Sequence, residues 1–144
     1  MLTDYRLVVP VEVRYGDLDA QGHVNNTRFF AYIEQARLGY LQHLGLWDGR
    51  DFMNLGVIVG DVHLRYIAPI YLGQAIQVGV RVMRLGNKSL TFENEIFDVQ
   101  TGAALARGET VVVAYDYHRH ASRPIPQEWR EIITRFDGPF PLEV

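Results

Sequence analysis

The sequence predicts an α+β fold in which one long helix packs across one face of an antiparallel sheet of about five strands. Two patterns support this prediction. Over residues 27–44 the apolar residues recur at intervals of three and four, as they do on the buried stripe of a helix. Most of the chain after residue 57 alternates apolar and polar residues, which is typical of half-buried strands.

The first strand is expected over residues 5–15. Its residues Val9, Val11, Val13 and Tyr15 are spaced by two and would share one face. Pro10 has no backbone N–H to donate to a neighbouring strand, so this strand should lie at an edge of the sheet or carry a bulge.

The long helix is expected from Thr27 to Leu44. Asn25 or Asn26 can cap its start with a side-chain oxygen, because these residue types satisfy the free N–H groups of the first turn. Gly45 follows the last apolar residue and can adopt the left-handed conformation that ends helices. Both ends of the helix are therefore marked.

Four more strands are expected after the helix, separated by turn residues. They are residues 58–68, 76–82, 89–98 and 103–115. Residues 58, 60, 62, 64, 66 and 68 would share one face of the first of these, and Pro69 ends it. The segments 85–87 and 100–102 contain glycine and fit tight turns, so the last three strands should form a meander.

The chain is expected to form a single domain over residues 1–144. Its core would span about 5–117, and the tail 118–144 would carry a short helix marked by Trp129, Ile132, Ile133 and Phe136. One sheet with open edge strands and a single covering helix favours self-association, so a homodimer or homotetramer is expected.

Composition excludes several classes of function. The 144 residues include no cysteine, which rules out disulfides, a thiolate nucleophile and cysteine-ligated metals. The net charge of −3 gives no basic surface for nucleic acid. The N-terminus lacks a signal-peptide pattern, and no apolar run approaches the roughly 18 residues of a membrane span. We expect a cytoplasmic protein that binds neither membrane nor nucleic acid.

Chemically active side chains gather where the first strand ends and the helix begins. Asp17, Asp19 and His23 lie within seven positions, directly before the free N–H groups of the helix start. Three side-chain amides share the segment: Gln21, Asn25 and Asn26. A base beside a group that holds an electrophile indicates hydrolysis of an acyl group. The residues alone do not separate Asp17 from Asp19.

The string Asp19-Ala20-Gln21-Gly22-His23-Val24-Asn25-Asn26, followed by Tyr32-Ile33-Glu34-Gln35-Ala36-Arg37, resembles the hotdog-fold acyl-CoA thioesterases of the 4-hydroxybenzoyl-CoA thioesterase-like family. The resemblance runs from about Val11 to Tyr115 and includes the segment 84–90. It implies a sheet wrapped around a central helix, paired chains, and thioester sites between subunits. It implies neither a cofactor nor a metal.

The resemblance also implies roles for individual residues. Asp19 would be the catalytic carboxylate, acting as a base or as a nucleophile. The backbone N–H of Asn26 would polarise the thioester carbonyl, and His23 would orient the carbonyl or the attacking water. Gln21 resembles the amide position of related plant-type thioesterases and would bind the substrate.

Recognition of the substrate is expected around the turn at residues 84–89. Arg84 and Lys88 are cations that suit the phosphates of coenzyme A, and Ser89 suits the amides of its pantetheine arm. The expected substrate is a thioester of coenzyme A or of an acyl-carrier protein.

Two alternatives remain open at this point. Asp17, Asp19 and His23 have the ligand types of a divalent-cation site. The same fold could also serve a non-catalytic acyl-CoA or acyl-carrier binding module, or a hydratase-like relative, because a fold does not determine a function.

Overall fold

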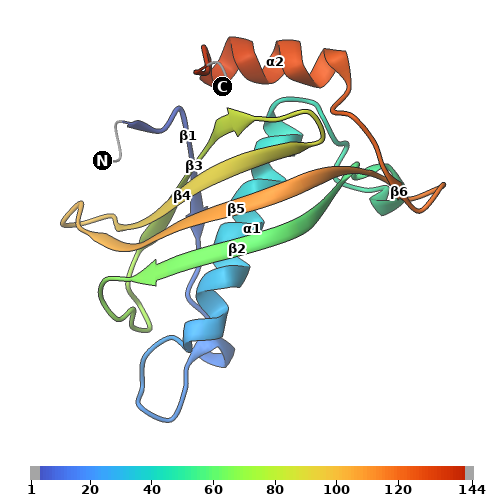
Figure 1. Ribbon diagram of the computed structural model, residues 1–144. Coiled ribbons are helices and arrows are strands. Elements are labelled where there is room, and N and C mark those ends of the chain that lie inside the picture. The colour runs from blue at the N-terminus through green and yellow to red at the C-terminus, as the bar shows by residue number, and fades with distance from the viewer. Residues whose placement is uncertain (1–3, 142–144) are drawn as a thin grey trace.

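The computed structural model describes residues 4–141, which form one curled antiparallel sheet, two helices and two short 3₁₀ turns (Figure 1). The strands are β1 (Leu7–Val11), β2 (Val57–Tyr66), β3 (Ile76–Leu85), β4 (Ser89–Asp98), β5 (Ala104–Asp116) and β6 (Ala121–Ser122). The helices are α1 (Asn26–His43) and α2 (Gln127–Asp137). The five long strands are ordered β1-β3-β4-β5-β2, and β6 pairs with β5.

The expected meander is confirmed by β3, β4 and β5, which pair consecutively. The core side of β3 is covered, since the side chains of Ile76, Val78, Val80 and Val82 are at most 2% exposed. These residues alternate with more polar ones, so their spacing of two placed them correctly on the core side of the sheet.

The position of β1 at the sheet edge is also confirmed, with Pro10 opposite Gln77 of β3. The expectation that this strand continues to Tyr15 is wrong. The strand ends at Val11, and Tyr15 begins a 3₁₀ turn in which its side chain is 83% exposed. The Asp17 carboxylate accepts a hydrogen bond of 3.0 Å from the Arg14 N–H and closes this turn.

The other edge of the sheet is β2, which pairs with β5. The expected common face over residues 58–68 is only partly right. The register shifts between Val59 and Asp61, which interrupts the alternation, and the side chains of Ile58 and Tyr66 remain more than 40% exposed. One long side of β2 therefore has no neighbouring strand within residues 4–141.

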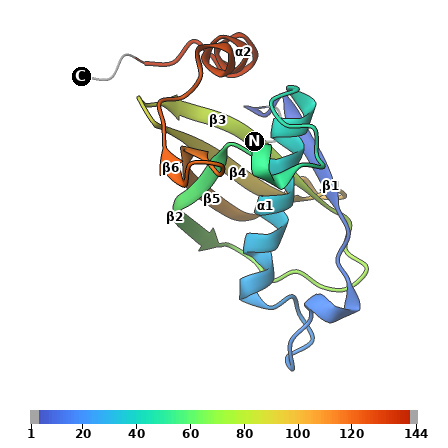
Figure 2. The same ribbon diagram turned by 90° about the vertical axis from the view of Figure 1, so that its right-hand side faces the viewer.

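The helix α1 begins and ends within one residue of its expected bounds. Its start is capped by Asn25, whose side chain accepts a hydrogen bond of 2.9 Å from the Thr27 N–H. Gly45 follows it with φ of 71°. The helix packs against β1, β3 and β4 and buries Ile33, Tyr40 and Leu41 (Figure 2).

The tail forms α2 where a short helix was expected, so the long helix is one of two helices within residues 4–141. The helix α2 lies across the end of the sheet and packs against β3, burying Trp129 and Ile133 (Figure 2). Its Asp137 carboxylate accepts hydrogen bonds from the Tyr40 hydroxyl at 2.5 Å and the Val82 N–H at 2.9 Å. Within residues 4–141, neither helix has the length and apolar character needed to cross a membrane.

Candidate active site

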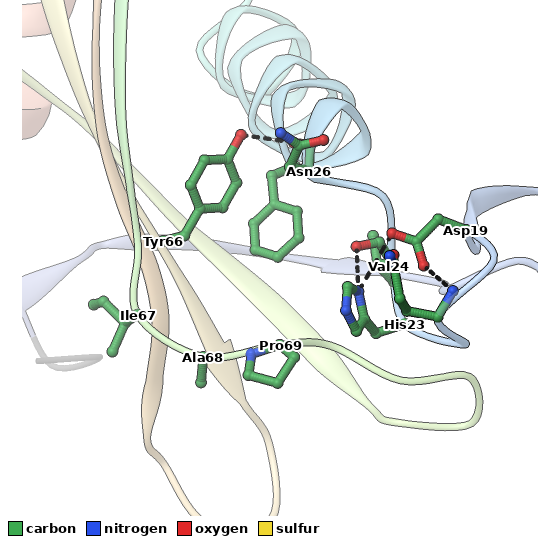
Figure 3. Close-up of a pocket in the computed structure, with 10 residues that line it drawn as sticks. Asp19, His23, Val24, Asn26, Tyr66, Ile67, Ala68 and Pro69 are labelled. Carbon is green, nitrogen blue, oxygen red and sulfur yellow. Dashed lines mark hydrogen bonds and ion pairs between the residues drawn. The ribbon is translucent and has the colours of Figure 1, made fainter.

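An open cavity of about 460 Å³ lies at the N-terminal end of α1, between the loop that precedes the helix and the end of β2 (Figure 3). One part of its lining is polar and comes from Asp19, Gln21, His23 and Asn26. The remaining part is mainly apolar and comes from Val24, Phe29, Tyr66, Ile67, Ala68 and Pro69. The cavity thus combines reactive groups with an apolar surface.

A tight loop places Asp19 and His23 side by side. The Asp19 N–H donates a hydrogen bond of 2.9 Å to the His23 carbonyl, and the Gly22 N–H donates one of 3.1 Å to the Asp19 carbonyl. Gly22 has φ of 83°, a conformation that glycine adopts without strain. The buried Val24 anchors the loop, because its N–H donates to the Ile70 carbonyl at 2.7 Å.

The carboxylate of Asp19 is held in a defined position. Its Oδ1 accepts a hydrogen bond of 2.9 Å from the Gln21 backbone N–H. With its amide nitrogen turned toward Asp19, the Gln21 side chain donates to Oδ1 and Oδ2 at 3.2 and 3.1 Å. The side chain of Asp19 remains 19% exposed, so a ligand in the cavity can reach it.

The ring of His23 is partly exposed and lies next to this carboxylate (Figure 3). Its Nδ1 is 3.5 Å from Oδ2 of Asp19 and 3.4 Å from the Val24 carbonyl oxygen. Both neighbours are acceptors and therefore favour the neutral tautomer with the proton on Nδ1, which leaves Nε2 as an acceptor. An edge contact with Tyr71 supports the ring, with centroids 6.4 Å apart.

The first turn of α1 has one unpaired backbone donor, and it belongs to Asn26, a residue that lines the cavity. The Thr27 N–H is bound to the Asn25 side chain, and the Arg28 N–H donates to the Asn25 carbonyl at 2.9 Å. The Asn26 N–H has no hydrogen-bond partner within residues 4–141. At this end the helix dipole is equivalent to roughly half a positive charge, so a polarised oxygen would be stabilised here.

The structure separates the two aspartates. Asp17 is absent from the lining of the cavity and faces a different hollow, which it shares with Tyr32 and Arg28. Its Oδ1 is 3.9 Å from Nε of Arg28. Only Asp19 therefore lies in the cavity with the unpaired donor.

The expected substrate-binding residues of the β3–β4 turn do not join this cavity within one chain. The turn that joins β3 to β4 lies beside α2, since Arg130 of α2 donates a hydrogen bond of 2.9 Å to the Asn87 carbonyl. The cavity is at the opposite end of α1 (Figure 1), so Arg84, Lys88 and Ser89 are not among its lining residues. The Lys88 amino group is 3.4 Å from the Ser122 hydroxyl. The chain thus brings Asp19, Gln21, His23 and Asn26 together without the turn.

Tyr66 and Pro69 line the cavity, although the sequence did not predict them as site residues. Tyr66 was assigned only to the face of a strand, and Pro69 only to its end. No local pattern pairs the end of β2 with the start of α1, because Tyr66 and Asn26 are 40 positions apart. A polar hydroxyl at the end of an apolar strand was the one available signal.

The alternative of a metal site receives no geometric support. Within residues 4–141, no group of three or more His, Cys, Asp or Glu side chains could hold a metal ion. Asp17, Asp19 and His23 do not converge in this way, since Asp17 faces the other hollow.

Comparison with known proteins agrees with the fold. The family model of the thioesterase-like superfamily matches residues 13–133. The long-chain acyl-CoA thioesterase FadM of Escherichia coli K12 is 24% identical over 121 residues, which are 84% of this chain and 92% of FadM. The acyl-CoA thioester hydrolase YbgC of E. coli O6:H1 is 27% identical over 129 residues, covering 88% of this chain and 92% of YbgC.

A solved structure provides a similar match. A thioesterase from Thermus thermophilus, crystallised with coenzyme A and Zn, superposes with a TM-score of 0.83 and 34% identity. The superposition covers 94% of this chain and 98% of that one. The hotdog thioesterase fold implied by the sequence resemblance is thereby confirmed, and the chain belongs to the thioesterase-like superfamily.

Proposed function

We propose that this protein hydrolyses acyl-CoA thioesters in the cavity at the start of α1, with Asp19 as the catalytic carboxylate. One observation carries the proposal: Asp19, with its fixed and accessible carboxylate, lines the same cavity as Asn26, whose backbone N–H at the helix start is unpaired. Hydrolysis of a thioester needs both a base or nucleophile and a donor for the developing oxyanion. The names of the relatives FadM and YbgC support the choice of an acyl-CoA substrate.

The thioester would bind with its carbonyl oxygen at the Asn26 N–H. Acting as a base, Asp19 would take a proton from water, and the resulting hydroxide would add to the carbonyl carbon before the carbon–sulfur bond breaks. Acting as a nucleophile, it would displace the thiolate and form an anhydride, which water then hydrolyses to the free acid. His23 and Gln21 would keep the carboxylate in place in either case.

The acyl group would lie against the apolar part of the cavity. Phe29 and Tyr66 form an edge-to-face pair there, with ring centroids 4.9 Å apart, and Pro69 borders them. Removing a hydrocarbon group from water against this surface contributes roughly 25 cal/mol per Å².

We further propose that the complete site is shared between two copies of the chain. The free edge of β2 can pair with β2 of a second copy around a two-fold axis, which makes the two strands antiparallel. The Val57 end of one β2 then lies beside the Tyr66 end of the other. Within each copy, Val57 of β2 pairs with Ala114 of β5, and the adjacent Val113 pairs with Ser89 of β4. Going from the β2 of one copy across the β2 and β5 of the other to its β4 crosses three strand spacings. The partner's Ser89 would therefore lie roughly 14 Å from the cavity.

This arrangement would return Arg84 and Lys88 to a role in substrate binding. The thioester would occupy the cavity of one copy, and the coenzyme A portion would extend toward the cations of the other. The proposal is supported by the free edge of β2 and by the opposite placement of the two groups in one chain.

The test is release of free thiol from a panel of short, long and aromatic acyl-CoA esters. The protein should release thiol from at least one ester. Asp19→Asn should lower kcat by on the order of 10²-fold or more while its circular dichroism spectrum is unchanged. Binding of the esters without thiol release would favour the non-catalytic binding module instead. Addition of water to an enoyl-CoA ester would favour a hydratase-like function.

Mixing two inactive variants tests the shared site. Asp19→Asn and a variant with Arg84→Glu and Lys88→Glu would be unfolded, mixed and refolded together. With equal amounts of the two variants, random pairing makes about half of the dimers heterodimers. If the site is shared, one of the two sites in each heterodimer combines an unaltered Asp19 with unaltered cations, so about a quarter of the parental activity should return. A mixture as inactive as its components would contradict sharing while leaving the catalytic role of Asp19 intact.

A further inference from the structure

We propose that Tyr66 is a positioning residue of this thioester site, whose hydroxyl holds the first turn of α1 so that the Asn26 N–H stays in place at the cavity. The hydroxyl donates a hydrogen bond of 2.8 Å to the Asn26 carbonyl oxygen. The inference rests on the proposed function, because it concerns the donor that polarises the thioester carbonyl.

The backbone groups that neighbour the unpaired Asn26 N–H all have hydrogen-bond partners. On the loop side, the Asn25 side chain binds the Thr27 N–H and hydroxyl at 2.9 and 2.7 Å. The Asn25 carbonyl accepts from the Arg28 N–H. On the sheet side, the Tyr66 hydroxyl binds the Asn26 carbonyl. The peptide between Asn26 and Thr27 is therefore fixed from both sides, and Tyr66 supplies the tie to the sheet. The unpaired N–H is in the preceding peptide and is joined to this one through the Asn26 Cα, so Tyr66 acts on its position through that atom.

Tyr66 connects the end of β2 to the start of α1 through both its hydroxyl and its ring. It is the last residue of β2, and its ring packs edge-on against Phe29 of α1 at 74°. Phe29 is buried, so this contact limits the movement of the Tyr66 ring. A tyrosine hydroxyl is protonated at neutral pH and can donate, and burial raises the pKa of Tyr66 further.

The hydroxyl is not required for the helix to form. The Asn26 carbonyl also has the usual helical acceptor position for the N–H four residues later, so α1 persists when the hydroxyl is removed. What is lost is the tie between the helix start and the end of β2. A shift of about 1 Å in a group that acts in the transition state can cost roughly 10²-fold in rate. The loss should therefore appear in kcat.

The test is Tyr66→Phe, which keeps the ring and its contact with Phe29. Its kcat on the best acyl-CoA should fall about 10-fold, while KM and the affinity for free coenzyme A measured by calorimetry change less than about twofold. Tyr40→Phe is the matched control. It also removes a tyrosine hydroxyl that donates a hydrogen bond, to Asp137 at 2.5 Å, but at the other end of α1. It should lower the melting temperature and leave kcat unchanged.

An unchanged kcat in Tyr66→Phe overturns the inference, as does a raised KM with an unchanged kcat, which would make Tyr66 a binding residue. An equal fall of kcat in Tyr40→Phe also overturns it, because loss of stability would then explain both. These outcomes leave the proposed function intact if Asp19→Asn is inactive. Failure of the unaltered protein to release any thiol would instead overturn the proposed function.

Discussion

The Tyr32 hydroxyl donates a hydrogen bond of 2.8 Å to Oδ2 of Asp17. The same oxygen accepts from the Arg14 N–H, so this carboxylate ties the turn before α1 to the body of the helix. Burial and the hydrogen bond to Asp17 raise the pKa of Tyr32 above its usual range. Two aspartates that are equivalent in the sequence therefore have different surroundings, one tied to the fold and the other open to the cavity.

Substituting Asp17 and Asp19 in turn should separate stability from catalysis. Asp17→Asn weakens a partly buried hydrogen bond to a charged group, so we expect the free energy of unfolding to fall by about 1–3 kcal/mol with kcat within about twofold of the parent. Asp19→Asn should show the reverse, with activity lost and a smaller change in stability. Urea denaturation and thiol-release kinetics on both variants measure the two effects. Loss of kcat in Asp17→Asn at full stability would reverse the assignment.

The parts of the fold that could be predicted depend on local patterns. The helix α1 has both a cap, Asn25, and a terminator, Gly45, in its sequence, and β3 has four buried residues at a spacing of two. The apolar residues spaced by two up to Tyr15 wrongly predicted that the first strand continues to that residue, because the Asp17 carboxylate closes a turn there. The bulge after Val59 is likewise set by pairing with β5, which no local pattern reveals.

The candidate site could be predicted where it is continuous in the chain. Asp19, Gln21, His23 and Asn26 lie within eight positions, and the structure brings them into one cavity. Tyr66 could not be found, because its contact with Asn26 joins residues 40 positions apart. The resemblance supplied the preference for Asp19 over Asp17, and of these two residues only Asp19 lines the cavity.

Gly79 of β3 should not tolerate a side chain. A Cβ at this position would lie 2.5 Å from Cγ of Tyr5, whose ring covers the outer face of the sheet. Gly79→Ala would displace this ring and break its hydroxyl hydrogen bonds to Glu93 and Glu95, so we expect a loss of about 1–3 kcal/mol in unfolding free energy. Gly16→Ala, which meets no atom within 4 Å, is the control and should be near neutral. Equal stability of the two variants would mean that Tyr5 moves aside without cost.

A charge on the free edge of β2 should separate the proposed dimer. Val59 is 44% exposed there, and Val59→Lys would place an ammonium group in the contact between two β2 strands. We expect sedimentation to show a dimer for the parent and a monomer of about 16.5 kDa for the variant, with thiol release lost in parallel. Val99→Lys is the control, because Val99 is similarly exposed at 48% but lies off this edge. A dimer that persists in Val59→Lys would place the contact elsewhere.

Three buried tyrosines should make the protein less stable in alkaline solution. Burial raises the pKa of Tyr5, Tyr32 and Tyr40, and neighbouring carboxylates of Glu93, Asp17 and Asp137 raise it further. In the unfolded chain these phenols lose their protons near pH 10, whereas in the folded chain they keep them. Above about pH 10 the unfolded state therefore binds fewer protons, and the free energy of unfolding falls as pH rises.

Urea denaturation between pH 8 and pH 11 measures this dependence. The free energy contributed by these phenols should be fully present below about pH 10 and should be lost as pH rises toward the folded-state pKa values. Tyr32→Phe removes one of the three groups, so the fall above pH 10 should become shallower. Tyr15→Phe should leave it unchanged, because the Tyr15 side chain is 83% exposed and faces solvent in both states. Equal slopes in the two variants would show that the Tyr32 phenol is not protected by the fold, and would weaken the pairing with Asp17 on which the separation of the two aspartates depends.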